Sequence, residues 1–171
     1  TNDTTGANAM TIDLYVIARA VNGGKTIDAV ETYAFQGGIF DGLSAEYQET
    51  YLDASLSLLE LAQGGETDPA MEEAAQQQEE MMSGIFAAWK ARDPEAFAQV
   101  YDKASVINSD DELNAKLFTE RDPGMIQAAA SYLETEGENT FFLAVGAGHM
   151  VDPGGIVSGL RGLGYTVELV E

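Results

Sequence analysis

The residues most able to do chemistry are a glutamate and a histidine that each follow a predicted strand. Glu31 ends the short, β-branched segment 25–31, and His149, the one histidine of the chain, follows the nearly continuous apolar run 140–146. In open α/β sheets, ligands bind at the carboxyl ends of the strands. If the two strands are parallel neighbours, a carboxylate and an imidazole face one crevice, and such a pair can bind a divalent metal ion or exchange a proton.

Each candidate also has a plain structural explanation. A single histidine at a strand end is often a hydrogen-bonded structural residue, and a metal site usually has three or more protein ligands. Arg121 is a third candidate, although Glu120 or Asp122 could neutralise it in an ordinary ion pair on a helix surface. Residue type and spacing leave these alternatives open.

Several familiar sites are excluded by their missing residues. Gly146 and Gly148 suggest a dinucleotide-binding turn, but the third glycine of that motif is absent, because position 151 is valine. The sequence has no phosphate-binding loop, nucleophile elbow, HExxH motif or calcium-binding loop of the EF-hand type. It also has no cysteine, which removes disulfides, thiolate metal sites and cysteine nucleophiles.

The charge balance restricts the possible partners. The sequence has 8 Lys and Arg against 29 Asp and Glu, a net charge of −21. Phosphate backbones and anionic lipid carry the same sign, so nucleic acid and membrane surfaces are poor partners. No apolar run approaches the ~20 residues of a membrane span, and we expect no direct membrane insertion of this segment.

Helices are predicted to position most of the chain. Apolar periodicity and capping signals place them at about 12–20, 45–63, 69–91, 93–105 and 111–134, the last with a break near residues 122–124. Thr67 or Asp68 is the expected cap of the third of these helices, and residues 33–43 are a helix start or a loop.

Three remaining segments are predicted to form a small, mostly parallel sheet. They are the strands near 25–31, 140–146 and 165–170, and the last two flank a short helix with Asp152 as N-cap, which makes a C-terminal βαβ unit. The expected fold class is therefore α/β and helix-rich. Residues 1–10 are expected to be a disordered lead-in, and residues 11–171 a single domain.

An apolar stripe on the predicted helix 69–91 contains two methionines and two aromatic residues. Met81, Met82, Phe86 and Trp89 recur at helical spacing, opposite a face of acidic and amide side chains. We interpret the stripe as core, with an adaptable binding surface as the alternative.

Several motifs, in order along the chain, resemble the TraB/PrgY/GumN family. The segment from Phe141 to Met150, with its Gly-x-x-His, is followed by Asp152-Pro-Gly-Gly-Ile156 and by Leu163-Gly-Tyr165, as in the carboxyl-terminal signature of that family. Upstream, Glu31-Thr32 with Gln36, the Trp89 to Asp93 junction and the pair Arg121-Asp122 also match, although Asp122 stands where the family usually has Asn.

The resemblance implies a divalent-metal-dependent hydrolase of the peptidase type. The family includes the Tiki proteins, which are regarded as metal-dependent proteases, and bacterial members implicated in the shutdown of peptide pheromones. Residue by residue, His149 would be a metal ligand or base, Glu31 an acidic metal-site residue, and Arg121 a charge stabiliser, so that these three form the catalytic set. Gly146 and Gly148 would support the loop, and the ion would be Mn or Co.

The family fold has two halves, each with a Gly-x-x-His motif, and nothing before Ile12 resembles the first half. We therefore expect this chain to be the carboxyl-terminal portion, as a piece of a longer protein or a natural truncation, and inactive alone. Its expected partners are a peptide or protein substrate and either a missing half or a second copy. An extracytoplasmic or cell-surface location in a bacterium is expected. The alternative function is a non-catalytic peptide- or protein-binding module with a helical, acidic surface.

Overall fold

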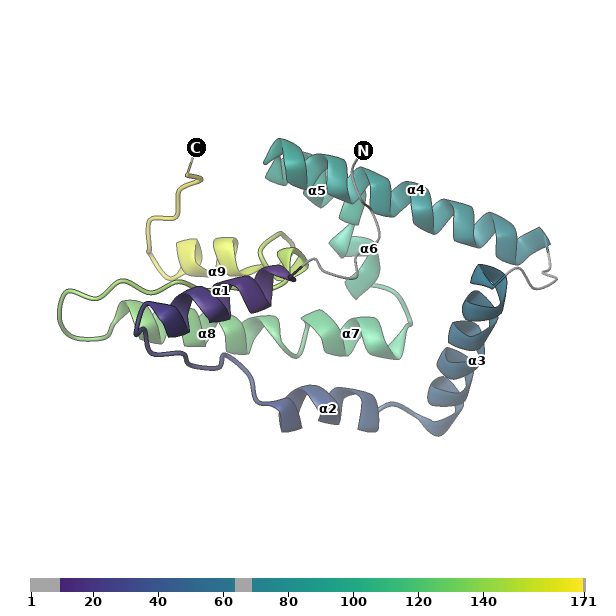
Figure 1. Cartoon of the computed structure of the whole chain (residues 1–171), viewed down its shortest axis with the longest axis horizontal. Coiled ribbons are helices and arrows are strands. Elements are labelled where there is room, and N and C mark those ends of the chain that lie inside the picture. The colour runs from purple at the N-terminus through teal and green to yellow at the C-terminus, as the bar shows by residue number, and fades with distance from the viewer. Residues whose placement is uncertain (1–9, 64–68, 171) are drawn as a thin grey trace.

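The computed structural model describes residues 10–63 and 69–170, and the regular secondary structure of these ranges is helical (Figure 1). The elements are α1 (Ile12–Asn22), α2 (Tyr33–Asp41), α3 (Ala45–Ala62), α4 (Pro69–Ala91), α5 (Pro94–Tyr101), α6 (Lys103–Ile107), α7 (Glu112–Phe118), α8 (Asp122–Leu133), the 3₁₀ turn η2 (Ala147–His149) and α9 (Ile156–Gly162).

Local capping signals set many of these boundaries. Thr11 and Thr32 cap α1 and α2, their side-chain oxygens accepting backbone hydrogen bonds from the first turn of each helix. Residues 33–43, predicted as a helix start or a loop, are mainly helix α2. The predicted caps Thr67 and Asp68 lie outside the described residues, as do residues 1–9 of the predicted lead-in.

The predicted helix 93–105 is divided into two. Asp93 caps α5 through the backbone N–H groups of Glu95 and Ala96, and Pro94 occupies its first turn. Asp102 then adopts a left-handed conformation, with φ of 41° and ψ of 54°, which ends α5. The Asp102 side chain accepts a hydrogen bond from Ser105 N and starts α6. The predicted break within 111–134 is confirmed, because α7 ends at Phe118 and α8 begins at Asp122.

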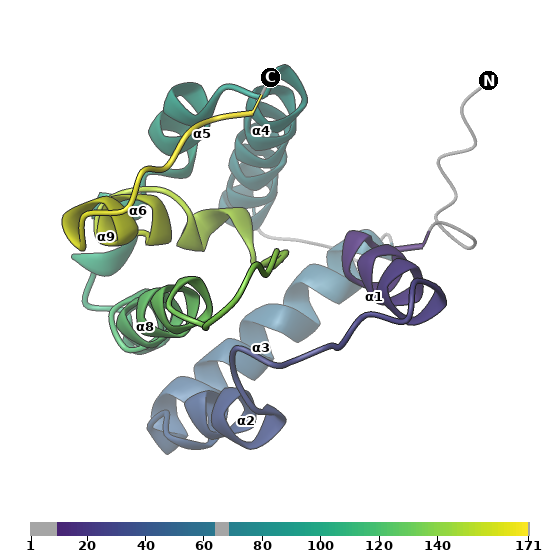
Figure 2. The same ribbon diagram turned by 90° about the vertical axis from the view of Figure 1, so that its left-hand side faces the viewer.

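Two small apolar clusters hold these helices together. Ile39, Leu43 and Leu113 join α2 and the start of α3 to α7. Met125, Ala129 and Ile156 join α8 to α9. Figures 1 and 2 show α4 and α5 side by side on one side of the central α8–α9 pair, and α2 on the other. Helix α1 buries none of its residues, and Figure 2 shows it apart from the central helices.

A glycine permits the close contact between α8 and α9. A Cβ built on Gly159 would lie 2.4 Å from Ile126 Cδ1, far inside van der Waals contact. Any larger residue at this position would have to push the two helices apart or move Ile126. The Gly159 contact therefore fixes how α9 sits on α8, whose first residues belong to the site described below.

The predicted α/β fold is wrong, because the described residues contain no strand or sheet. The segments near 25–31, 140–146 and 165–170 lack regular secondary structure, and no backbone ladder joins them within the described part of the chain. A strand is defined by pairing with a neighbour, and apolar alternation only shows which side chains face a core. Here Val30, Leu143 and Val145 pack against the α8–α9 cluster without that pairing.

The predicted C-terminal βαβ unit is wrong for the same reason, and its helix also starts later than expected. Gly155, not Asp152, is the N-cap, and Ile156 is the first helical residue. Residues 150–155 form the turn and bends between η2 and α9, and the Asp152–Pro153 peptide bond is cis. The apolar signal of Ile156 and Leu160 located the helix, whereas the proline misplaced its start.

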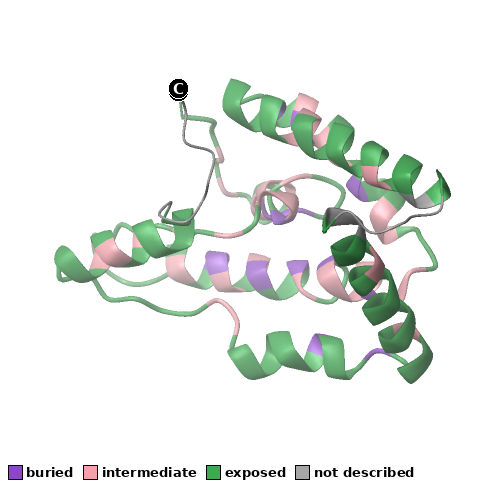
Figure 3. Cartoon of the chain, turned by 45° about the vertical axis from the view of Figure 1, so that its right-hand side comes forward, coloured by how far each residue is buried: buried purple, intermediate pink, exposed green. Residues whose placement is uncertain are grey.

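The apolar stripe of α4 is largely exposed rather than core. Met81, Met82, Phe86 and Trp89 are 39–54% exposed, while Ala88 on the same helix is buried. Figure 3 shows that exposed residues dominate α3 and α4, and that buried positions are concentrated on the central helices. None of the described helices is both long enough and apolar enough to span a membrane.

Candidate functional site

His149 is placed by the short turn η2, at the end of the apolar segment. Its backbone N–H donates to Gly146 O at 3.0 Å, which closes the turn and directs the imidazole inward, where the residue is 8% exposed. A Cβ on Gly148 would lie 2.8 Å from Tyr101 Oη, so this position requires glycine. A Cβ on Gly146 would lie 3.6 Å from His149 Cδ2, an ordinary contact. Gly148 is thus the glycine on which the loop conformation depends.

The imidazole is oriented by Asp122, the first residue of α8. His149 Nδ1 lies 2.6 Å from Asp122 Oδ1, and both side chains are nearly buried. A carboxylate can only accept, so the hydrogen of this bond belongs to Nδ1. His149 Nε2 has no hydrogen-bond partner in the described part of the chain, which leaves it as the available ring nitrogen.

A buried lysine completes this group. Lys103 Nζ donates to Asp122 Oδ2 at 2.6 Å and to the backbone oxygen of Val151 at 2.9 Å, and its side chain has no exposed surface. The Lys103 ammonium also lies 5.1 Å from the ring centroid of Phe118, whose ring contacts that of His149 at 5.2 Å. One carboxylate therefore joins a lysine from α6 and a histidine from η2.

Arg121, immediately before Asp122, holds Glu31 in a two-point ion pair. Its Nε donates to Glu31 Oε1 at 3.0 Å, and its Nη2 donates to Oε2 at 2.6 Å. Gln36 Nε2 donates to the same Oε2 at 3.3 Å. The expected neutralisation of Arg121 by Glu120 or Asp122 is not what the structure shows, since the partner comes from a segment 90 residues away.

The electrostatics of this pair favour the ionised glutamate. Hydrogen bonds from the Arg121 guanidinium hold the pKa of Glu31 below its ordinary value of 4.5, against partial burial, which acts in the opposite direction. Gln36 and the charges of Arg121 and His149 lower this pKa further. The influence of His149 shows that the two pairs, Arg121–Glu31 and Asp122–His149, belong to one electrostatic neighbourhood.

The structure thus brings together all three predicted site residues, Glu31, Arg121 and His149, around the N-terminus of α8. Two further members, Asp122 and Lys103, were not selected from the sequence as site residues. Asp122 carried a signal, because it departs from the usual Asn of the resembling family. Lys103 carried none, since a single lysine in a polar segment is normally on the surface.

These residues provide only part of a metal site. Within the described ranges no three His, Asp or Glu side chains are grouped so that they could hold a metal ion. Both oxygens of Glu31 are engaged by Arg121, so Glu31 does not fit as a ligand in this arrangement. His149 does fit: its Nε2 is available and its Nδ1 is bonded to a carboxylate, as in most metal-bound histidines.

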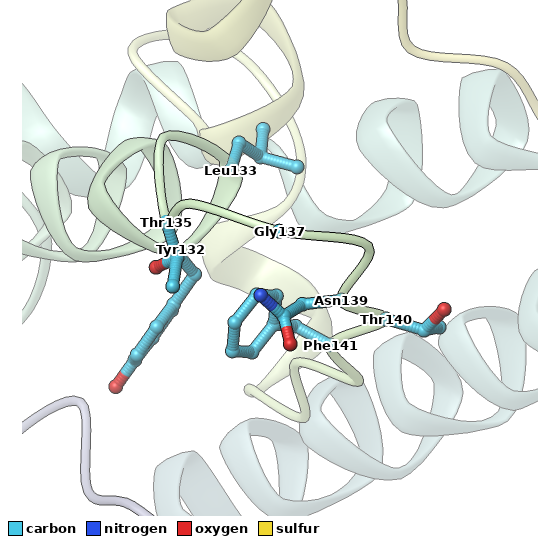
Figure 4. A pocket seen from close by; sticks show the side chains of 7 residues that line it. All are labelled: Tyr132, Leu133, Thr135, Gly137, Asn139, Thr140 and Phe141. Carbon is cyan, nitrogen blue, oxygen red and sulfur yellow. The ribbon is translucent and has the colours of Figure 1, made fainter.

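Two hollows lie near α8, at opposite ends of the helix. A mainly apolar hollow of about 230 Å³ adjoins Asp122 and is lined also by Ile107, Phe118, Thr119, Pro123, Pro153 and Gly154. The other, of about 280 Å³, is shown in Figure 4, where Tyr132, Phe141 and Asn139 gather at the turn that follows α8. None of the predicted site residues lines the hollow in Figure 4, whereas the first one lies beside the site.

The fold and the site together define a helical protein with a histidine-centred polar group at the start of one helix. The chain belongs to the TraB/PrgY/gumN family, whose model matches residues 1–169. No curated protein and no solved structure matches the chain.

Proposed function

We propose that this chain is part of a divalent-metal-dependent hydrolase that acts on peptides, with His149 at its reactive centre. The observation that carries the proposal is the buried Asp122–His149 pair, which fixes the imidazole and leaves Nε2 available. A buried histidine with one nitrogen bonded to a carboxylate and the other available is suited to binding a metal ion. Membership of the TraB/PrgY/gumN family supports the same assignment.

His149 Nε2 is the one ligand atom that we assign to this chain, with Mn or Co as the proposed ion. When bound, a divalent ion polarises a substrate carbonyl and makes its bound water more acidic. The remaining ligands would come from outside the described residues or from a partner chain. Asp122 orients the imidazole and keeps its hydrogen on Nδ1, so that the lone pair of Nε2 points away from the buried carboxylate.

Arg121 and Glu31 have supporting roles in this proposal. Glu31 takes both Nε and Nη2 of Arg121, which holds the guanidinium plane in one orientation. Nη1 of Arg121 has no hydrogen bond within the described ranges. We assign this edge of the guanidinium to the stabilisation of negative charge on a substrate oxygen. The apolar hollow beside Asp122 would receive an uncharged side chain of the peptide.

The test is calorimetric titration of Mn²⁺ and Co²⁺ into the wild-type protein and His149→Ala, paired with peptide hydrolysis. We expect His149→Ala to lower metal affinity by about 10-fold or more, and Asp122→Asn to lower it within the ~10–100-fold range typical of residues that orient a ligand. Asp152→Asn removes an exposed carboxylate three residues from His149 and is the matched control. Unchanged metal affinity and hydrolysis in His149→Ala would show that the assignment is wrong.

A second candidate function, a peptide- or protein-binding module, is favoured by the exposed apolar side chains of α4. Met81, Met82, Phe86 and Trp89 lie on a chain with a net charge of −21. An adaptable apolar surface surrounded by acidic residues suits a basic amphipathic peptide. In this alternative His149 is structural.

Fluorescence anisotropy with a labelled basic amphipathic peptide separates the two candidates. Binding that persists in His149→Ala but fails in Phe86→Ser would support the module. Gln77→Ser, at an exposed polar position of the same helix, is the control. Binding that is lost in His149→Ala but kept in Phe86→Ser would instead favour the site at α8.

A further inference from the structure

Lys103 is the most deeply buried charged residue in the described part of the chain. The residue is 1% exposed, less than any described side chain except that of Ile156, which is equally buried. Burial of an ammonium group costs several kcal/mol unless it is paired and hydrogen-bonded. An apolar side chain of similar length would fill the same space without that cost. Packing alone therefore does not account for a lysine at this position.

The contacts of Lys103 all lead to the immediate surroundings of His149. Nζ donates to Asp122 Oδ2, the carboxylate oxygen that His149 does not use. It donates also to the backbone oxygen of Val151, two residues beyond His149. The Phe118 ring under the ammonium packs against the imidazole as well. Lys103 thus contacts the carboxylate that orients the histidine and the loop that follows it.

We propose that Lys103 is a positioning residue, which acts through Asp122 to keep the hydrogen of the His149 imidazole on Nδ1 and the lone pair on Nε2. The inference rests on the proposed function for its purpose, since an available Nε2 is what a metal ion requires. Its physical basis is independent of metal or substrate, because it concerns only the hydrogen bonds among three buried side chains.

Charge balance explains how a lysine can decide the place of a histidine hydrogen. With Lys103 present, the buried carboxylate of Asp122 has a cationic partner, and a neutral imidazole donating from Nδ1 completes its hydrogen bonds. Without Lys103, the carboxylate is left unbalanced in a buried place, which favours uptake of a proton by the pair. If the proton goes to the imidazole, or to Asp122 so that Nδ1 becomes the acceptor, Nε2 carries a hydrogen in either case.

The test uses the fact that His149 is the only histidine, so that its two ring nitrogens are the only imidazole signals in the spectrum. The two nitrogens are observed by ¹⁵N NMR in the metal-free full chain, at a pH above the ordinary imidazole pKa of about 6.5. In the wild type we expect the hydrogen on Nδ1. In Lys103→Met we expect the form with hydrogen on Nε2 to become the major one. Lys25→Met, at an exposed lysine, should leave the wild-type pattern unchanged.

A double variant separates charge balance from the loss of packing. Lys103→Met with Asp122→Asn removes both charges, and the Asn side-chain oxygen can still accept from Nδ1. We expect the double variant to return the hydrogen to Nδ1 and to melt at a higher temperature than Lys103→Met alone. The same comparison holds if Lys103→Met is too unstable to study, because the double variant is still expected to fold.

Two results would overturn the proposal. One is a folded Lys103→Met variant that keeps the wild-type pattern at both ring nitrogens. The other is a double variant that is no more stable than Lys103→Met, which would mean that the shape of the lysine, not its charge, is what matters. A shifted hydrogen in Lys103→Met, together with no metal binding by the wild type, would support the role of Lys103 and contradict the proposed function instead.

Discussion

The Arg121–Glu31 pair is the contact that connects the N-terminal third of the chain to α8. Both side chains are mostly buried, with 14% and 9% of their surface exposed, and two hydrogen bonds fix their geometry. A planar, two-point contact of this kind is specific to arginine, because a lysine offers a single charged point. Loss of either partner leaves the other with an unsatisfied charge in a partly buried position.

We therefore expect Arg121→Gln to lower the free energy of unfolding by about 2 kcal/mol, a typical value for a hydrogen-bonded charged group. Urea denaturation of the wild type and the variant measures this difference. Arg19→Gln, at an exposed position of α1, is the control and should change stability little. If Arg121→Gln and Glu31→Gln destabilise additively in the double variant, the two residues do not act as a pair.

The same pair contributes a pH dependence with a definite sign. The fold lowers the pKa of Glu31 from its ordinary 4.5, chiefly through the Arg121 hydrogen bonds, so the folded chain favours the ionised carboxylate. This stabilisation is fully present above pH 4.5 and is lost as the pH falls through the lowered value. Thermal unfolding over this acidic range should be less pH-dependent in Arg121→Gln than in the wild type. An equal pH dependence in both would contradict the role of Arg121.

At this scale the sequence identified the residues but not their partners. Glu31, Arg121 and His149 could be selected because their side chains are chemically capable and the ordered motifs are specific. Their pairing depends on contacts between residues 27 to 90 positions apart, which no local pattern encodes. Lys103 was hidden for the same reason, since only the fold shows that its ammonium is buried against Asp122.

At the scale of elements, α9 offers two glycines with opposite requirements. A Cβ on Gly159 would lie 2.4 Å from Ile126 Cδ1, whereas a Cβ on Gly162 meets nothing within 4 Å. We expect Gly159→Ala to destabilise the protein by about 1–3 kcal/mol through overpacking of α9 against α8. Gly162→Ala should instead stabilise it by up to about 1 kcal/mol, because alanine restricts the unfolded chain. Thermal denaturation of the two variants checks the predicted opposite shifts, and equal shifts would contradict the close packing.

The unpaired segment 140–146 makes a prediction for hydrogen exchange. Its backbone N–H groups donate to no other backbone group in the described part of the chain, whereas those of α8 are held in a helix. Amides of residues 141–145 should therefore exchange much faster than those of residues 126–130, as hydrogen–deuterium exchange with mass spectrometry can measure. Slow exchange of residues 141–145 in the isolated protein would show that this segment is paired after all.

The helices were largely predictable and the sheet was not, for a physical reason. A helix satisfies its hydrogen bonds within a few residues, so the caps Thr11, Thr32 and Asp93 and the periodic apolar residues mark it locally. Strand pairing needs a second segment at a specific distance, and the apolar run around Leu143 could not reveal whether one was present. The run instead packs Leu143 and Val145 on the α8–α9 cluster.

At the scale of the whole molecule, the exposed surface is large for the mass. The chain of 18.2 kDa exposes 12,890 Å². A compact monomer of this mass exposes roughly 8,100 Å², so the excess is about 4,800 Å². Large apolar side chains contribute to it, including Leu52 and Leu59 of α3 and Phe86 and Trp89 of α4, each at least 51% exposed. An excess of this size is comparable to the area that obligate oligomers bury.

We expect a second copy of the chain to cover part of this surface. The net charge of −21 opposes such association, and salt should promote it, because the screening length falls from about 10 Å at 0.1 M to about 3 Å at 1 M. Trp89 is the only tryptophan and is half exposed, so its fluorescence reports on α4 alone. As protein concentration rises, its emission should move to shorter wavelength, and sedimentation velocity should show a dimer or larger species, both more strongly at high salt.

Phe86→Ser should weaken this association, because it removes an exposed apolar side chain three residues from the reporter. Phe142→Ser removes a similarly exposed ring from the segment that precedes η2, and it should leave the association unchanged if α4 forms the contact. A monomer at every concentration and salt, with constant Trp89 emission, would contradict self-association. The exposed apolar side chains of α4 would then be free for a peptide or protein partner, because self-repulsion among 29 acidic side chains would keep two copies apart even when their charges are screened.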